Sequence, residues 1–130
     1  VNIFNLSFKE NIIFNNKNIS SKKFENNIKN SELFNFYSKY IKKNKNYLLS
    51  QDKINLSTGQ KQRVGISRIY YKDADLIVLD EATNGLDSKT EDKILKYLKM
   101  IAKNKIIIII SHKSRTLKIC DKVIKLPLKK

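Results

Sequence analysis

Apolar residues in the first part of the chain, up to about residue 55, recur with the spacing of an α-helix. Leu33, Phe36, Tyr37, Tyr40 and Ile41 stand at positions i, i+3, i+4, i+7 and i+8, which places them on one face of an amphipathic helix. Residues 15–23 are polar and typical of a loop. This part of the chain is therefore predicted to consist of helices joined by polar loops.

From residue 56 the pattern becomes an alternation of helices and short apolar runs. Its spacing predicts helices over residues 57–71, 88–102 and 114–120, and strands over 76–80, 105–111 and 122–126. Capping-box pairs, Ser57 with Gln60 and Ser88 with Glu91, mark two of the helix starts. The strands 76–80 and 105–111 are apolar at successive positions, which favours parallel strands covered on both faces. The order strand–helix–strand implies an α/β fold with right-handed crossovers.

Composition changes this picture little. The formal net charge is +15, and lysine, asparagine and isoleucine supply 58 of the 130 residues. Because all three have A/T-rich codons, a biased genome explains the charge. The lysines are scattered, and arginine, which binds phosphate through a bidentate fork, is rare. Nucleic acid is therefore not expected as a partner.

Two further features limit the class of protein. Cys120 is the only cysteine, so no disulfide can form within the chain. The longest apolar run, residues 106–110, is far shorter than the roughly 20 residues that a membrane-spanning helix needs. No membrane-spanning helix is expected within these 130 residues.

Candidate chemistry begins with Ser57, Thr58, Gly59 and Gln60, at the predicted start of a helix. The first turn of a helix presents free N–H groups and a partial positive charge, which bind anions. Gly59 has no side chain and would let a phosphate approach the backbone, and the Ser57 hydroxyl could donate to it. An ordinary capping box is the simpler explanation of these four residues taken alone.

Two adjacent acids, Asp80 and Glu81, follow an apolar run at the predicted carboxyl end of a strand, where open α/β sheets bind ligands. One could hold Mg²⁺ while the other polarises an attacking water, although two solvated acids at a strand end are the alternative. His112, the only histidine, follows the next parallel strand and should emerge at the same edge. There it could contact a γ-phosphate, but a lone histidine is more often structural.

Together these motifs resemble those of the ATP-binding cassette (ABC) ATPases. Leu-Ser-Thr-Gly-Gln-Lys-Gln-Arg at 56–63 resembles the signature motif, and Leu-Ile-Val-Leu-Asp-Glu-Ala-Thr at 76–83 resembles the Walker B strand with its catalytic glutamate. Asn-Gly-Leu-Asp at 84–87 is similar to the D-loop, and Ser-His-Lys at 111–113 to the switch histidine loop. Residues 4–12 and 111–126 resemble exporter-type cassettes, so the resemblance covers essentially the whole chain.

The resemblance implies the second half of a RecA-like P-loop ATPase core, residues 56–130, preceded by a helical subdomain, residues 1–55. It implies ATP and Mg²⁺ as cofactors, with Glu81 as the catalytic base, His112 on the γ-phosphate and Asp80 on Mg²⁺. The signature residues would contact the ATP of a second nucleotide-binding domain: Ser57, Thr58, Gly59 and Gln60. Asp87 would lie at that dimer interface.

The resemblance further implies ATP hydrolysis that drives export through a transmembrane domain, at the cytoplasmic face of the cell membrane. Thr58 departs from the family, which usually has glycine there, and no Gly-x-x-x-x-Gly-Lys-Ser/Thr loop occurs in the sequence. A C-terminal fragment lacking the Walker A and Q-loop motifs is thus implied, and the isolated chain is predicted to be inactive. The absent Walker A strand would leave apolar sheet surface uncovered.

Two alternatives to a transporter domain remain open from the sequence. One is a non-transport ABC ATPase that acts on DNA or ribosomes, which the positive charge would suit. The other is an inactive truncated remnant that contributes only a signature motif to a partner. Intact Asp80, Glu81 and His112 argue against long-decayed function.

Overall fold

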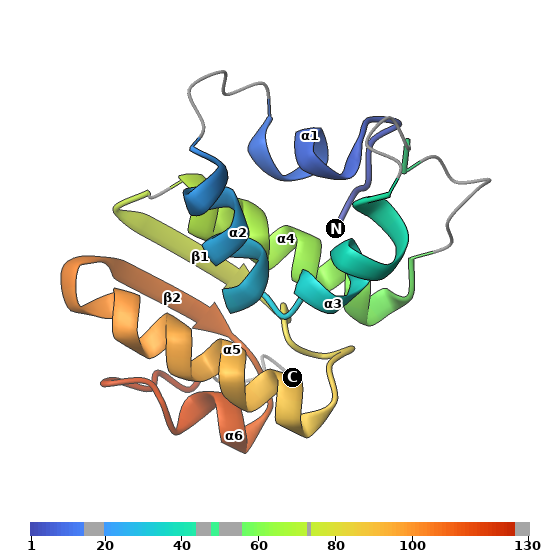
Figure 1. The fold of residues 1–130 in the computed structure, drawn as a ribbon. Helices are drawn as coiled ribbons and strands as arrows, with labels where there is room; N and C mark the ends of the chain where they lie inside the picture. The colour runs from blue at the N-terminus through green and yellow to red at the C-terminus, as the bar shows by residue number, and fades with distance from the viewer. Residues whose placement is uncertain (15–19, 44–47, 50–55, 73, 127–130) are drawn as a thin grey trace.

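The computed structural model describes residues 1–14, 20–43, 48–49, 56–72 and 74–126. Figure 1 shows helix α4 (Thr58–Lys72) running between a group of short helices and a small sheet region. The helix predicted over residues 57–71 is therefore confirmed, and Ser57 and Gln60 form its predicted capping box. None of the helices in the described ranges is long and apolar enough to cross a membrane.

The helical region consists of α1 (Phe8–Ile13), α2 (Ser21–Asn30), α3 (Phe34–Phe36) and a single π-helical turn, η1 (Tyr37–Ile41). Ser20 caps α2 by accepting a hydrogen bond from the Lys23 N–H, so residues 21–23 are helical and not part of the predicted loop. The remainder of that loop, residues 15–19, lies outside the described residues.

The predicted helical face that begins at Leu33 is present, with one exception. Leu33, Phe36 and Ile41 are buried and Tyr37 is half-buried, but Tyr40 is 51% exposed. The Lys42 N–H donates to the Tyr37 carbonyl five residues back, which widens the turn. The π turn therefore changes the spacing that the α-helical pattern assumed.

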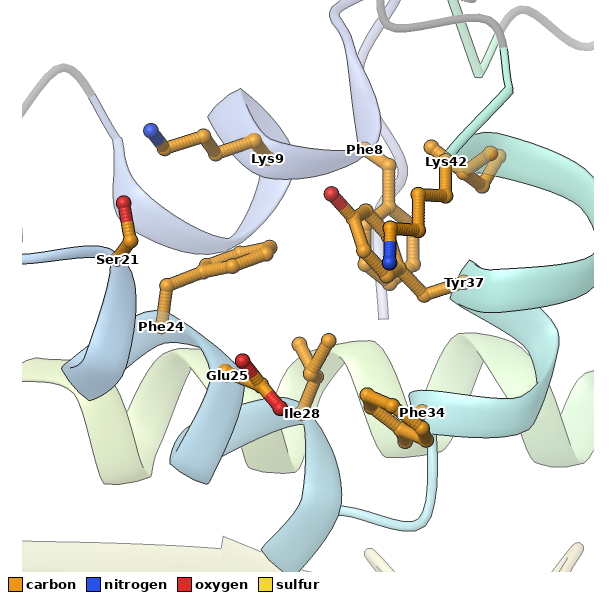
Figure 2. A pocket seen from close by; sticks show the side chains of 10 residues that line it. Phe8, Lys9, Ser21, Phe24, Glu25, Ile28, Phe34, Tyr37 and Lys42 are labelled. Carbon is orange, nitrogen blue, oxygen red and sulfur yellow. The ribbon is translucent and has the colours of Figure 1, made fainter.

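A helical core fills the space between these helices and α4. It comprises Phe8, Ile12, Phe24, Ile28, Leu33, Phe36, Ile41, Leu49, Leu56, Val64 and Tyr71. Figure 2 shows the rings of Phe8, Phe24 and Tyr37, which come from α1, α2 and η1, facing a common space. Phe8 lies 6.5 Å from Phe24 and 5.5 Å from Tyr37 between ring centroids, and the group lines a pocket of about 350 Å³.

Buried polar contacts fix α4 against the first two helices. The Asn27 side-chain amide donates to the Ser67 carbonyl at 2.9 Å, and the Ser67 hydroxyl donates to the Asn27 side-chain oxygen at 2.6 Å. The Arg68 guanidinium donates to the Asn11 carbonyl at 2.7 Å. The helix that begins with the signature motif is thus joined to α1 and α2 by packing and by hydrogen bonds.

The sheet region contains two parallel strands, β1 (Leu76–Asp80) and β2 (Ile106–Ile110), joined through α5 (Ser88–Ile101) and a 3₁₀ turn, η2 (Ala102–Asn104). The register pairs Leu76 with Ile106 and Asp80 with Ile110. A short helix, α6 (Ser114–Leu117), follows β2 and ends three residues before the predicted end at residue 120. The predicted parallel arrangement and the strand–helix–strand order are confirmed.

Two details of this region differ from the sequence prediction. Asp87, not Ser88, caps α5, because its carboxylate accepts a hydrogen bond from the Thr90 N–H at 3.0 Å. Residues 122–126 form no strand, since they pair with no strand in the described part of the chain. Their apolar side chains Ile124 and Leu126 are 73% and 84% exposed.

The sheet is covered on one face only. A sheet core on the covered face comprises Ile66 from α4, Ile77 and Leu79 from β1, and Ile94, Leu95 and Leu98 from α5. The opposite face, called the open sheet face here, consists of Leu76, Val78, Ile106, Ile108 and Ile110, which are 48–68% exposed. The prediction that both faces are covered is therefore wrong for the described residues, whereas uncovered apolar surface is present as expected.

Candidate functional site

Glu81 and His112 meet at the carboxyl ends of the two parallel strands, as the sequence predicted. Glu81 follows β1, and its backbone N–H donates to the Ile110 carbonyl at the end of β2 at 3.0 Å. The His112 Nδ1 atom lies 3.0 Å from the Glu81 Oε1 atom. Because the strands end in register, one hydrogen bond across their ends brings the acid and the imidazole together.

The backbone and the electrostatics of Glu81 are both unusual. Its φ of 47° lies in the left-handed region, which few non-glycine residues adopt, so the loop turns sharply after β1. The hydrogen bond from His112 holds the pKa of the Glu81 carboxyl below its ordinary value, against partial burial, which raises it. The Oε2 atom is buried and has no hydrogen-bond partner within the described part of the chain. In this conformation the Oε2 atom is therefore shielded from solvent, while His112 contacts the Oε1 atom.

Asp80 lies at the end of β1 with an exposed side chain. The described residues contain no group of three or more His, Cys, Asp or Glu side chains that could hold a metal ion by themselves. Mg²⁺ commonly uses one or two protein carboxylates and completes its shell with water and phosphate oxygens. A single exposed carboxylate beside Glu81 fits that manner of binding.

The signature residues form the first turn of α4, and their polar atoms are partly used within the helix. The Ser57 hydroxyl accepts from the Gln60 N–H at 3.2 Å, and the Gln60 side-chain oxygen accepts from the Ser57 N–H at 2.9 Å. Ser57 and Thr58 are exposed, and Gly59 is half-buried. Backbone N–H groups in a first helical turn have no preceding carbonyl in the helix to bind, so this turn can accept an anion.

Gly59 is required for a reason that the sequence did not reveal. A Cβ atom on Gly59 would lie 2.8 Å from the carbonyl oxygen of Gly85, in the loop after β1. The Gly85 N–H in turn donates to the Gln62 side-chain oxygen at 2.8 Å. The start of α4 and the loop 84–87 therefore pack backbone against backbone.

Asp87 ends that loop, and its carboxylate is occupied by the cap of α5. Hydrogen bonds from Thr90, the backbone N–H first, lower the pKa of Asp87 below its ordinary value. The side chain remains exposed to solvent. A residue at this position can thus set the direction of the loop and still face another molecule.

Three residues near the site were missed by the sequence reasoning: Thr83, Glu91 and Lys113. The Lys113 ammonium reaches back from the His112 loop to the Thr83 carbonyl and to the Glu91 carboxylate. The only sequence signal was that Lys113 directly follows His112. The partners of Lys113 come from distant positions that no spacing rule connects.

Comparisons with known proteins identify the family of this chain. The sequence model of the ABC transporter family matches residues 4–84. An export ATP-binding/permease protein of Rickettsia felis is 35% identical over 95% of this chain, and an ATP-dependent lipid A-core flippase of Pseudoalteromonas translucida is 33% identical over 93%. The chain spans 21% of the length of each of these relatives.

A solved structure leads to the same family. A bacterial Atm1-family ABC exporter with ATP bound superposes with a TM-score of 0.78 and 27% sequence identity, over 88% of this chain and 20% of that one. The predicted exporter-type resemblance and the predicted α/β fold are therefore confirmed. The chain belongs to the ABC transporter family and forms part of an exporter-type ATP-binding domain.

Proposed function

We propose that this chain supplies the water-activating part of an ATP site, within a longer protein that couples ATP hydrolysis to export. The observation that supports this most directly is the contact between Glu81 and His112 at the ends of β1 and β2. A carboxylate that follows a strand end and contacts an imidazole is a candidate general base. The named relatives, an export protein and a flippase, favour transport over action on DNA or ribosomes.

Each site residue has a distinct role in this proposal. Glu81 accepts a proton from the attacking water, and its lowered pKa keeps it ionised at neutral pH. His112 fixes the Glu81 carboxylate through Oε1 and can contact the γ-phosphate. Asp80 would hold Mg²⁺, which neutralises charge on the phosphates when it is bound.

The signature residues would act on a neighbouring site. Ser57, Thr58, Gly59 and Gln60 would contact ATP that is bound to a second nucleotide-binding domain, through the first turn of α4. Asp87 would lie at the interface between the two domains. Residues 1–55 would form a helical subdomain and residues 56–130 the second half of the RecA-like core, facing a transmembrane domain at the cytoplasmic side of the membrane.

The isolated 130 residues should hydrolyse no ATP. Phosphate affinity in P-loop proteins comes from a glycine-rich loop of backbone N–H groups and its lysine. No such loop occurs in the sequence. The signature turn would serve a partner's nucleotide, so it cannot replace the missing loop within the same chain.

Substitution of Glu81 by glutamine in the full-length protein tests the proposal. Glu81→Gln should leave ATP binding nearly intact and reduce hydrolysis by about 10²-fold or more, since general-base catalysis contributes that much. Glu25→Gln is a matched control, because Glu25 lies on the exposed surface of α2, where it forms an ion pair with Lys29. Hydrolysis by Glu81→Gln within a few-fold of the control would reject Glu81 as the base.

A further inference from the structure

The contact between His112 and Glu81 is too exposed to hold itself in place. The side chains are 75% and 38% exposed, respectively. A hydrogen bond or ion pair that faces water contributes little net free energy, because water competes for both partners. If this contact matters for hydrolysis, another part of the structure must fix the loop that carries His112.

Lys113, the next residue, has the buried contacts that His112 lacks. Its ammonium donates to the Thr83 carbonyl at 2.9 Å and to the Glu91 carboxylate at 3.1 Å. The side chains of Lys113 and Glu91 are only 24% and 5% exposed. The Thr116 hydroxyl lies 3.5 Å from the same Glu91 oxygen, so the carboxylate is held from α6 as well. A buried pair with this many hydrogen bonds tolerates little displacement.

Two hydrogen bonds join the loop that carries His112 to the loop that carries Glu81, and Lys113 makes one of them. On one side, the Glu81 N–H donates to the Ile110 carbonyl, two residues before His112. On the other side, Lys113 donates to the Thr83 carbonyl, two residues after Glu81. The two loops are therefore joined on both flanks of the His112–Glu81 contact, and each loop can move only if one of these bonds breaks.

From this arrangement we infer that Lys113 is a positioning residue for ATP hydrolysis, and that Glu91 anchors it. The Lys113 ammonium is bound by Thr83 and Glu91, so its role is to fix the distance between the His112 loop and the Glu81 loop. The inference rests on the proposed function of Glu81 and His112. It adds two residues, one in the His112 loop and one in α5, that set how well the pair is aligned.

Lys113→Met in the full-length protein removes the ammonium and keeps an unbranched apolar stem. The kcat for ATP hydrolysis should fall about 10- to 100-fold, since small misalignments of catalytic groups have effects of that size. The KM for ATP should change less than about threefold, because the Lys113 ammonium is bound by Thr83 and Glu91 within the chain. Lys113→Arg, which keeps the charge and the donors, should recover most of the lost kcat.

Lys96→Met is the matched control, since Lys96 is an exposed lysine on α5 with no polar partner in the described residues. Glu91→Gln gives a second route to the same answer, because it removes the anchoring charge while Lys113 stays in place. It should lower kcat in the same direction as Lys113→Met. If Lys113→Met fails to fold in a thermal unfolding assay, Lys113→Arg and Glu91→Gln decide the question.

Two outcomes separate the inference from the proposed function. If Glu81→Gln abolishes hydrolysis but Lys113→Met and Glu91→Gln match Lys96→Met, the inference is wrong and the proposed function stands. If Glu81→Gln hydrolyses ATP normally, the proposed function fails first. A rise in KM with unchanged kcat in Lys113→Met would also overturn the inference, because a lysine that aligns the base must act on turnover.

Discussion

The helical region and the sheet region of this chain differ in how completely their apolar side chains are buried. In the helical region, Phe8, Ile12, Ile28 and Leu33 are fully buried by neighbours from the same 130 residues. In the sheet region, alternate residues of both strands are covered, and the open sheet face is left to solvent. The difference shows that a hydrophobic pattern predicts which side chains need cover, but not which part of a protein provides it.

The contrast follows from the two kinds of secondary structure. An amphipathic helix has one apolar stripe, and a few such helices can cover one another. A strand of a parallel sheet has two apolar faces and needs a layer on each. Here α4 and α5 supply one layer, and the relatives, which are about five times longer, have the residues to supply a second.

The largest expected difference in the free energy of unfolding is between two isoleucine substitutions, one in each region. Ile28→Ala in the helical core should lower the free energy of unfolding by about 2–5 kcal/mol, because it leaves a cavity at a fully buried site. Ile108→Ala on the open sheet face, which is 48% exposed, should cost less than about 1 kcal/mol. Urea unfolding of the isolated chain measures both. Equal losses would mean that the sheet face is covered in solution.

The buried hydrogen bonds between α2 and α4 should have a smaller effect. Ser67→Ala removes the hydroxyl that donates to the Asn27 side-chain oxygen and leaves that buried atom unpaired. The expected loss is about 1–3 kcal/mol in the free energy of unfolding. Ser21→Ala on the exposed start of α2 is the control. An unchanged urea midpoint for Ser67→Ala would show that packing alone holds the helical region.

The smallest expected effect is a pH dependence in the sheet region. The folded-state pKa of Asp87 lies below its ordinary value of 3.8, so ionised Asp87 stabilises the folded state above that pH, and this contribution is lost as the pH falls through the folded-state pKa. Asp87→Asn should therefore be less stable than wild type at pH 7, and the difference should shrink as the pH falls from about 4 through the folded-state pKa. Urea midpoints at pH 7 and pH 3 check this. A difference that is equally large at pH 7 and pH 3 would assign the effect to something other than the charge.

Local sequence patterns predicted most of the helices and strands, and also that Glu81 and His112 lie close together. The periodicity placed α4, α5, β1 and β2 within a few residues, and strand order alone brought Glu81 and His112 to one edge. Each of these predictions depends on residues close in sequence or on a general rule for parallel sheets. Such information is present in a single chain.

Other features depended on contacts between distant residues. The strand over residues 122–126 needs a neighbouring strand, and none of the described residues pairs with it. The role of Gly59 depends on Gly85, and the position of Lys113 depends on Glu91, each more than 20 residues away. Periodicity and capping rules describe one element at a time, so they cannot reveal these pairs.

The left-handed backbone at Glu81 affects how this position can change over evolutionary time. Aspartate, asparagine and glycine tolerate a φ of 47°, whereas valine and isoleucine resist it because they branch at Cβ. A lineage that no longer needs the proposed base could replace Glu81 with aspartate, asparagine or glycine and keep the loop. Replacement by a branched residue would strain the turn that also carries the contacts of Lys113 and Gln62. The backbone conformation thus limits which residues can replace Glu81 without disturbing the fold.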